Sequence, residues 1–120
     1  ALSSIVKWKY DDFHQVMLAD FSVDKQDQVL IALQQVLPMQ WDAKSIKKAP
    51  DEVRHYAGVF SKLVKQQKLF STNIEYQPTV MAAWWPWGHG ATVSVRLFLT
   101  NTAPYVAKTG IIHKLTRLFA

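Results

Sequence analysis

The sequence contains no cysteine, so it forms no disulfide and offers neither a thiolate metal ligand nor a cysteine nucleophile. A cysteine-based zinc finger is therefore excluded. The chain also lacks the run of about 18 apolar residues that a membrane-spanning helix requires. Its longest apolar-rich stretch, residues 80–99, is interrupted by proline, glycine, histidine and arginine. We therefore predict a soluble protein without a transmembrane segment.

Acidic residues are scarce in the second part of the chain, where Glu75 is the only acid after Glu52. Residues 1–52 hold eight acids and six bases, whereas residues 53–120 hold one acid and eight bases, and the whole chain has a formal net charge of +5. This segregation of charge indicates an anionic partner, which could be a nucleic acid, a membrane surface or an acidic protein.

Common enzyme signatures are absent as well. The sequence contains no G-x-S-x-G, no P-loop, no Rossmann glycine pattern and no H-E-x-x-H. A pair of catalytic carboxylates would have to come from the amino-terminal half, where nearly all the acids lie. We therefore favour a protein that is not an enzyme and needs no cofactor. A convergent active site without a recognisable motif is the alternative.

One short stretch, DDFH, places Asp11, Asp12 and His14 close together and offers oxygen and nitrogen ligands to a divalent ion. His55, His89 or His113 would have to complete such a site. Because the spacing matches no recognised metal site, we favour a hairpin turn followed by a histidine on a strand, and we predict no metal.

At 120 residues and 49% hydrophobic, the chain has the size of a single domain, residues 1–120, with one core. It begins at Ala1 rather than at methionine. We therefore expect a processed mature form, an excised domain or a trimmed form, and leave both a cytoplasmic and an exported location open.

The local patterns predict an α+β fold in the order ββααββα, with two hairpins forming an antiparallel sheet and about three helices packed on one face. The predicted strands are residues 5–10, 13–21, 73–85 and 92–100, although a helix also fits residues 13–21. The predicted helices run from a cap at Ser22 or Asp24 to Pro38, over residues 50–69, and from Pro104 or Thr109 onward. Residues 39–49 are expected to be a connector with about one helical turn at most.

The helix expected at residues 50–69 has a favourable start, because Pro50 suits the first helical position and Asp51 and Glu52 complement the helix dipole. Its predicted buried stripe consists of Val53, Tyr56, Ala57, Phe60, Leu63 and Val64. The opposite face carries bases, which indicate either an ordinary solvated surface or a stripe that neutralises phosphates.

The sequence WWPWGHG, residues 84–90, is predicted to connect the last two strands. Trp84 and Trp85 are consecutive in a strand, so they should point to opposite faces and one should enter the core. Trp87 falls at the tip, where it would be either a contact for another molecule or part of a structural lid.

These observations lead us to expect a non-enzymatic binding module for an anionic partner, nucleic acid or another polyanion. The alternative is a protein–protein interaction or assembly domain, with an exported protein and a homo-oligomer both open, that docks through the tryptophan-rich loop. A small enzyme without a recognisable motif is the third reading. The predicted binding residues are Lys47, Lys48, Arg54, Lys62, Lys65, Lys68, Trp85, Trp87 and His89.

Overall fold

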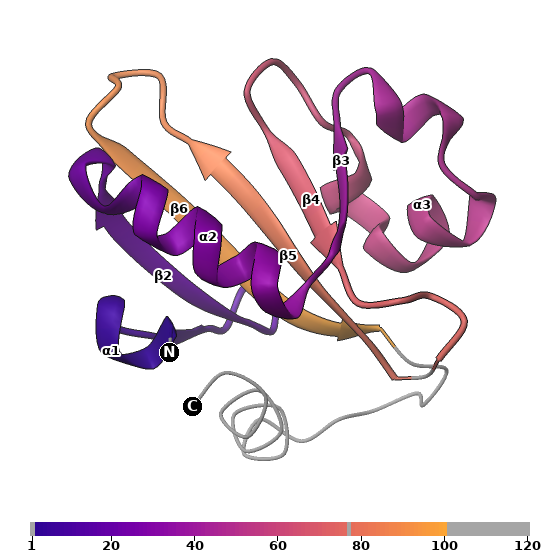
Figure 1. The fold of residues 1–120 in the computed structure, drawn as a ribbon, viewed down its shortest axis with the longest axis horizontal. Coiled ribbons are helices and arrows are strands. Elements are labelled where there is room, and N and C mark those ends of the chain that lie inside the picture. The colour runs from indigo at the N-terminus through magenta and orange to yellow at the C-terminus, as the bar shows by residue number, and fades with distance from the viewer. Residues whose placement is uncertain (1, 77, 101–120) are drawn as a thin grey trace.

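The computed structural model describes residues 2–76 and 78–100 and has an α+β fold (Figure 1). Its helices and strands are α1 (Leu2–Ile5), β1 (Lys9–Asp11), β2 (Val16–Ser22), α2 (Gln26–Val36), β3 (Met39–Asp42), α3 (Asp51–Ala57), β4 (Lys68–Ser71), β5 (Thr79–Pro86) and β6 (Thr92–Thr100). Short 3₁₀ helices cover Val23–Lys25, Ser45–Lys48 and Gly58–Ser61. The predicted α+β class is confirmed, but the predicted order ββααββα is wrong in detail.

The strands form one six-stranded sheet in the order β1-β2-β6-β5-β4-β3, with every neighbouring pair antiparallel. The β1–β2 and β5–β6 hairpins were both predicted. The hydrogen-bonded register aligns Leu18 with Arg96 and Arg96 with Ala83, so these residues lie in one row across β2, β6 and β5. The pair β5–β6 occupies the centre of the sheet.

Helices cover both faces of this sheet. On β5, Val80, Ala82 and Trp84 point to the first face, where they pack with Val29 and Leu33 of α2. The residues between them point to the second face, which is covered by α3 and two of the 3₁₀ helices. The expectation that the helices pack on one face is wrong, because β5 is apolar on both sides and both sides must be shielded from water.

The long helix predicted for residues 50–69 is much shorter. Helix α3 ends at Ala57, and Gly58 has a φ of +57°, a conformation that side chains with a Cβ rarely adopt. The chain continues as a 3₁₀ helix and then as β4, whose Leu69 and Phe70 are buried on opposite faces of the sheet. Val64, predicted to be buried, is 60% exposed.

Three other segments differ from their predicted structure. Residues 39–49 begin with strand β3, which pairs with β4 and buries Trp41. Residues 5–10, predicted as a strand, contain the end of α1 and the start of β1. Leu2 and Val6, four residues apart, are both buried against α2 and the sheet, which favours the helical turn.

The strands predicted at residues 13–21 and 73–85 exist but start later, as β2 and β5. In the first case the Asp11 carboxylate accepts hydrogen bonds from the backbone N–H groups of Phe13 and His14, which holds residues 12–15 in a turn. Helix α2 and strand β6 match their predictions. The helix predicted after Pro104 or Thr109 lies outside the described residues.

Replacing Phe60 by Ala should lower the free energy of unfolding by about 3 kcal/mol, because Phe60 is buried and its ring centroid lies 5.0 Å from that of Phe98. The exposed Val64, replaced by Ala, should change it by less than about 0.5 kcal/mol. Urea melts of both variants provide the measurement. A similar cost for the two changes would show that residues 58–64 pack as the continuous helix that the sequence suggested.

Candidate aromatic and basic edge

The loop between β5 and β6 closes tightly. The Trp87 backbone N–H donates to the Thr92 carbonyl over 3.0 Å, and the Gly90 N–H donates to the Trp87 carbonyl over 3.0 Å. Gly90 has a φ of +80°, which explains a glycine at this position. His89 is exposed, and its Nδ1 accepts a hydrogen bond from the Ala91 backbone N–H over 3.1 Å. The loop is therefore ordered by its own backbone.

The consecutive tryptophans point to opposite faces, as predicted. Trp84 is 4% exposed on the first face, where its ring lies 5.7 Å from that of Phe21 and 6.3 Å from that of Phe70. Trp85 lies half-buried on the second face. One member of the pair therefore stabilises the core and the other is accessible.

Trp87 is held in a fixed orientation although it is 45% exposed. Its indole Nε1–H donates to the Ser94 hydroxyl over 2.7 Å, and that hydroxyl donates in turn to the Asp20 carboxylate. Lys9 lies 3.5 Å from the same carboxylate. A large exposed aromatic ring with a defined orientation loses little conformational freedom on contact with another molecule.

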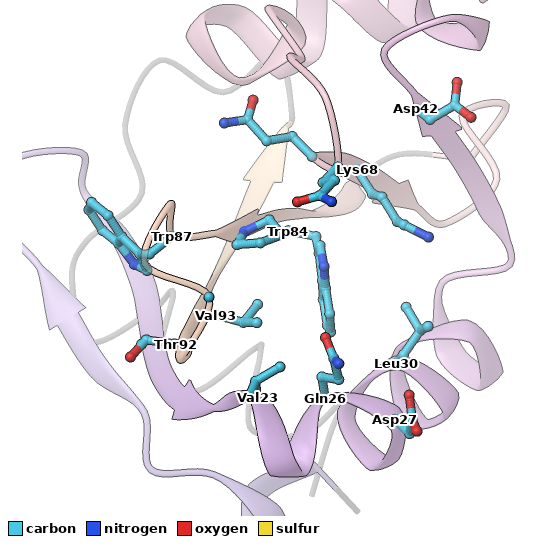
Figure 2. Close-up of a pocket in the computed structure, with 14 residues that line it drawn as sticks. Val23, Gln26, Asp27, Leu30, Asp42, Lys68, Trp84, Trp87, Thr92 and Val93 are labelled. Carbon is cyan, nitrogen blue, oxygen red and sulfur yellow. The ribbon is translucent and has the colours of Figure 1, made fainter.

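A cavity of about 530 Å³ lies on the first face beside this loop. Figure 2 shows Trp84 inside it, Gln26 and Leu30 of α2 on one side, and Asp42 and Lys68 on the other. Trp87 and the start of β6 complete the wall. The cavity therefore has an aromatic interior and a mixed polar rim.

A smaller cavity of about 290 Å³ lies on the second face. It is lined by His14, Val59, Phe60, Trp85, Trp87 and Arg96. The exposed Trp87 contributes to both cavities and thus marks the boundary between them.

Asp11 joins two of the residues around the smaller cavity. Its Oδ2 accepts from His14 Nδ1 over 2.7 Å and from Arg96 Nε over 3.3 Å. Burial by itself raises the pKa of the Asp11 carboxyl, but the hydrogen bonds from His14 and Arg96 outweigh this effect and place the pKa below its usual 3.8. Within residues 2–76 and 78–100, no group of three or more histidine and acidic side chains is arranged to hold a metal ion.

The predicted basic residues do not share one helical face, because the helix that would carry them ends at Ala57. Arg54 turns inward: its Nη1 donates to the backbone carbonyls of Ile46 and Ala49 over 2.8 and 2.9 Å, and its Nη2 contacts Asp51. The Arg54 guanidinium therefore links α3 to the preceding segment. The predicted lysines lie elsewhere: Lys47 and Lys48 are in a 3₁₀ helix, Lys62 and Lys65 in the segment before β4, and Lys68 in β4.

The sheet nevertheless brings these segments to one edge. Asp42 at the end of β3 pairs with Lys68 at the start of β4, and Lys68 pairs with Trp84 near the end of β5. The segment after β3, the segment before β4 and the β5–β6 loop therefore lie along the same edge, at the top of Figure 1. We call this the aromatic and basic edge; it carries five predicted lysines together with Trp85, Trp87 and His89.

Acidic groups lie at this edge as well, because Asp27 and Asp42 line the larger cavity together with Lys68. Asp42 accepts from the backbone N–H groups of Ser45 and Lys44 over 2.8 and 2.9 Å, and these bonds, that from Ser45 first, lower the pKa of its carboxyl. Asp24 lies in the 3₁₀ helix before α2 and Asp27 in the first turn of α2, on the β2 side of the edge. The lysines lie on the β3–β4 side.

Sequence reasoning missed Arg96 and Phe60 as members of a site. Arg96 is the one charged residue in the alternating run TVSVRLFLT, and that isolation in an apolar strand was the available signal. The sequence suggested His14 as a metal ligand and not as a residue that lines a cavity. The position of His14 beside the smaller cavity depends on the register of β1 and β2, which the sequence does not specify.

Comparison of the chain with models of known protein families, with curated proteins and with solved structures finds no match. Among the helices of the described residues, none has the length and apolar character needed to cross a membrane.

Because the hydrogen bonds to Asp11 favour its ionised form in the folded state, they stabilise the fold above pH 3.8, and this contribution is lost as the pH falls through the lower folded-state pKa. Asp11→Asn should therefore reduce the free energy of unfolding at about pH 7 more than at about pH 3. Urea melts at the two pH values test this, with the exposed Glu75→Gln as the matched change of charge. A loss from Asp11→Asn that is equal at both values would contradict the assignment.

Proposed function

We propose that the protein is a non-enzymatic binding module for an anionic partner, nucleic acid or another polyanion, which it contacts through the aromatic and basic edge. The observation that carries the proposal is the larger cavity, because both a lysine and tryptophans of this edge line it. Lys68 and the adjoining residues 66 and 67 line one side of the larger cavity and Trp87 another, and the carboxylates of Asp27 and Asp42 also line it, so an anionic group would have to lie nearer Lys68 than these acids. An extended polyanion that touches one wall would reach the other.

The two kinds of residue supply complementary interactions. Lysines neutralise phosphate or sulfate groups and release counterions, which accounts for affinity that falls with salt. An exposed indole stacks on a nucleotide base or on the face of a sugar without reading sequence. The hydrogen bond from Trp87 to Ser94 fixes the indole before contact, and this favours recognition over a purely structural loop.

The charges along the edge indicate where on it the polyanion would lie. Asp24 and Asp27 on the β2 side would repel anionic groups, whereas Lys62, Lys65 and Lys68 would attract them on the β3–β4 side. Arg54 is left out of the proposed contact, because its guanidinium is already used to hold α3. The proposed contact is thus narrower than the set of bases predicted from the sequence.

Protein docking is the second candidate, and one observation favours it. Phe13, Val59 and Trp87 are large hydrophobic side chains that are 89%, 69% and 45% exposed. Val59 and Trp87 line the smaller cavity, and the Phe13 ring lies 4.7 Å from that of His14, which also lines it. Salt discriminates between the candidates, because hydrophobic docking responds little to ionic strength.

Replacing Lys62 and Lys65 together by Gln should weaken binding to single-stranded DNA while leaving folding unchanged, because both side chains are exposed. The slope of log affinity against log salt should become shallower by about 1.4, or about 0.7 for each lost phosphate contact. Titrations at several salt concentrations with an oligonucleotide, and in parallel with a heparin fragment, provide the measurement.

The matched control is Lys7→Gln with Lys25→Gln, which removes the same charge from exposed lysines outside the proposed lysine contact. This pair should leave most of the binding and its salt slope intact. Trp87→Ala should weaken the nucleic acid complex by about 1 to 3 kcal/mol without changing the slope. Equal losses in the two double variants would contradict a localised contact, and retention independent of salt would favour protein docking.

A further inference from the structure

The smaller cavity differs from the larger one in the chemistry of its walls. Phe60, Trp85 and Trp87 give it aromatic surfaces, and Val59 adds an aliphatic one. Among the described residues that line it, Arg96 carries the only permanent charge, and none is a carboxylate. The larger cavity, in contrast, has both Asp42 and Lys68 on its rim.

Arg96 retains hydrogen-bonding capacity beyond its contact with Asp11. Its guanidinium has five N–H donors in a planar fork, and the structure assigns its Nε to Asp11 over 3.3 Å. Its side chain is 15% exposed, and no buried side-chain nitrogen among the described residues lacks a partner, so the other donors of Arg96 are hydrogen-bonded or reached by water that a ligand could replace. Asp11 meanwhile accepts from the backbone of Phe13 and from His14, so its charge is shared among several donors.

We propose that this cavity is a binding site for a small aromatic carboxylate. The carboxylate would accept two hydrogen bonds from the Arg96 guanidinium, whose geometry suits that group, and the ring would pack among Phe60, Trp85 and Trp87. The cavity volume of about 290 Å³ lies near the lower end of the range for small-molecule sites, which fits a single ring. The site goes beyond the proposed polyanion contact, because it shares Trp85 and Trp87 with that contact but uses none of its lysines.

Benzoate is a suitable probe, with benzamide and benzylamine as neutral and cationic analogues of the same shape. In ¹H–¹⁵N spectra of the full chain, benzoate should shift the indole signals of Trp85 and Trp87 and the backbone amide of Phe60, with millimolar affinity. Benzamide should bind at least about tenfold more weakly, because it loses the charge-assisted hydrogen bonds. Benzylamine should produce no shifts at these positions.

Arg96→Gln should abolish the preference for benzoate over benzamide, but it also removes a partner of Asp11 and so affects folding. Val59 provides a second test, because it lines the cavity and is 69% exposed. Val59→Glu should weaken benzoate binding about two- to fivefold, and Val59→Lys should strengthen it by a similar factor. The matched control is Val64→Glu, at a valine that is 60% exposed and does not line the cavity, and it should leave the affinity unchanged.

The site is overturned if benzoate causes no shifts at Trp85 and Trp87, if benzamide binds as well as benzoate, or if Val64→Glu weakens binding as much as Val59→Glu. Trp85 and Trp87 belong to both proposed sites, so the polyanion contact is tested separately through its lysines. The Lys62→Gln and Lys65→Gln double variant should bind benzoate like the parent chain, so failure of one proposal is distinguishable from failure of the other.

Discussion

The burial of β5 on both faces is the constraint on which the rest of this structure depends. All residues from Thr79 to Trp84 are buried, so neither side of the strand tolerates water. The sheet therefore needs apolar cover from two directions, and the chain supplies it with α1 and α2 on the first face and with α3 and short 3₁₀ helices on the second. β5 must also be paired along both sides, which places β6 on one side and recruits β4 on the other.

The same constraint produces the candidate site. Recruiting β4, with β3 beside it, brings the segments before β4 and after β3 next to the β5–β6 loop. Segments that carry lysines thereby lie along the same edge of the sheet as the tryptophan-bearing loop, and Lys68 lines one cavity with Trp84 and Trp87. On the second face, the polar side chains of Ser94 and Arg96 in β6 bond to Asp20 and Asp11, and Ser94 is fully buried beneath Trp87. The smaller cavity lies beside Arg96, between Phe60 and Trp85.

Sequence reasoning succeeded where a local pattern was sufficient. The alternation in residues 92–100, the glycines of the hairpin loop and the apolar period of α2 each predicted the observed element. It failed where tertiary pairing overrides local preference. Residues 58–69 were predicted to continue the helix, yet Gly58 ends it, and pairing with β5 makes residues 68–71 a strand.

The candidate site was predictable only in those parts that a local sequence pattern determines. Trp87 at a hairpin tip follows from local turn chemistry, whereas its exposure was one of two alternatives that the sequence left open. The role of Arg54 was not predictable, because its partners are backbone carbonyls of a 3₁₀ segment that has no sequence signature. Arg96, His14 and Phe60 lie far apart in sequence, and only the sheet register and the path of the chain after α3 bring them together.

The central claim is that one edge of the sheet forms the contact with an anionic partner. Backbone amide shifts recorded while a short single-stranded oligonucleotide is titrated into the uniformly labelled chain test it most directly. The account predicts that the perturbed amides lie in residues 43–50, 62–68 and 86–91 and that added salt reverses the shifts. Perturbations confined to the exposed side of α2, or no perturbation at low salt, would contradict it.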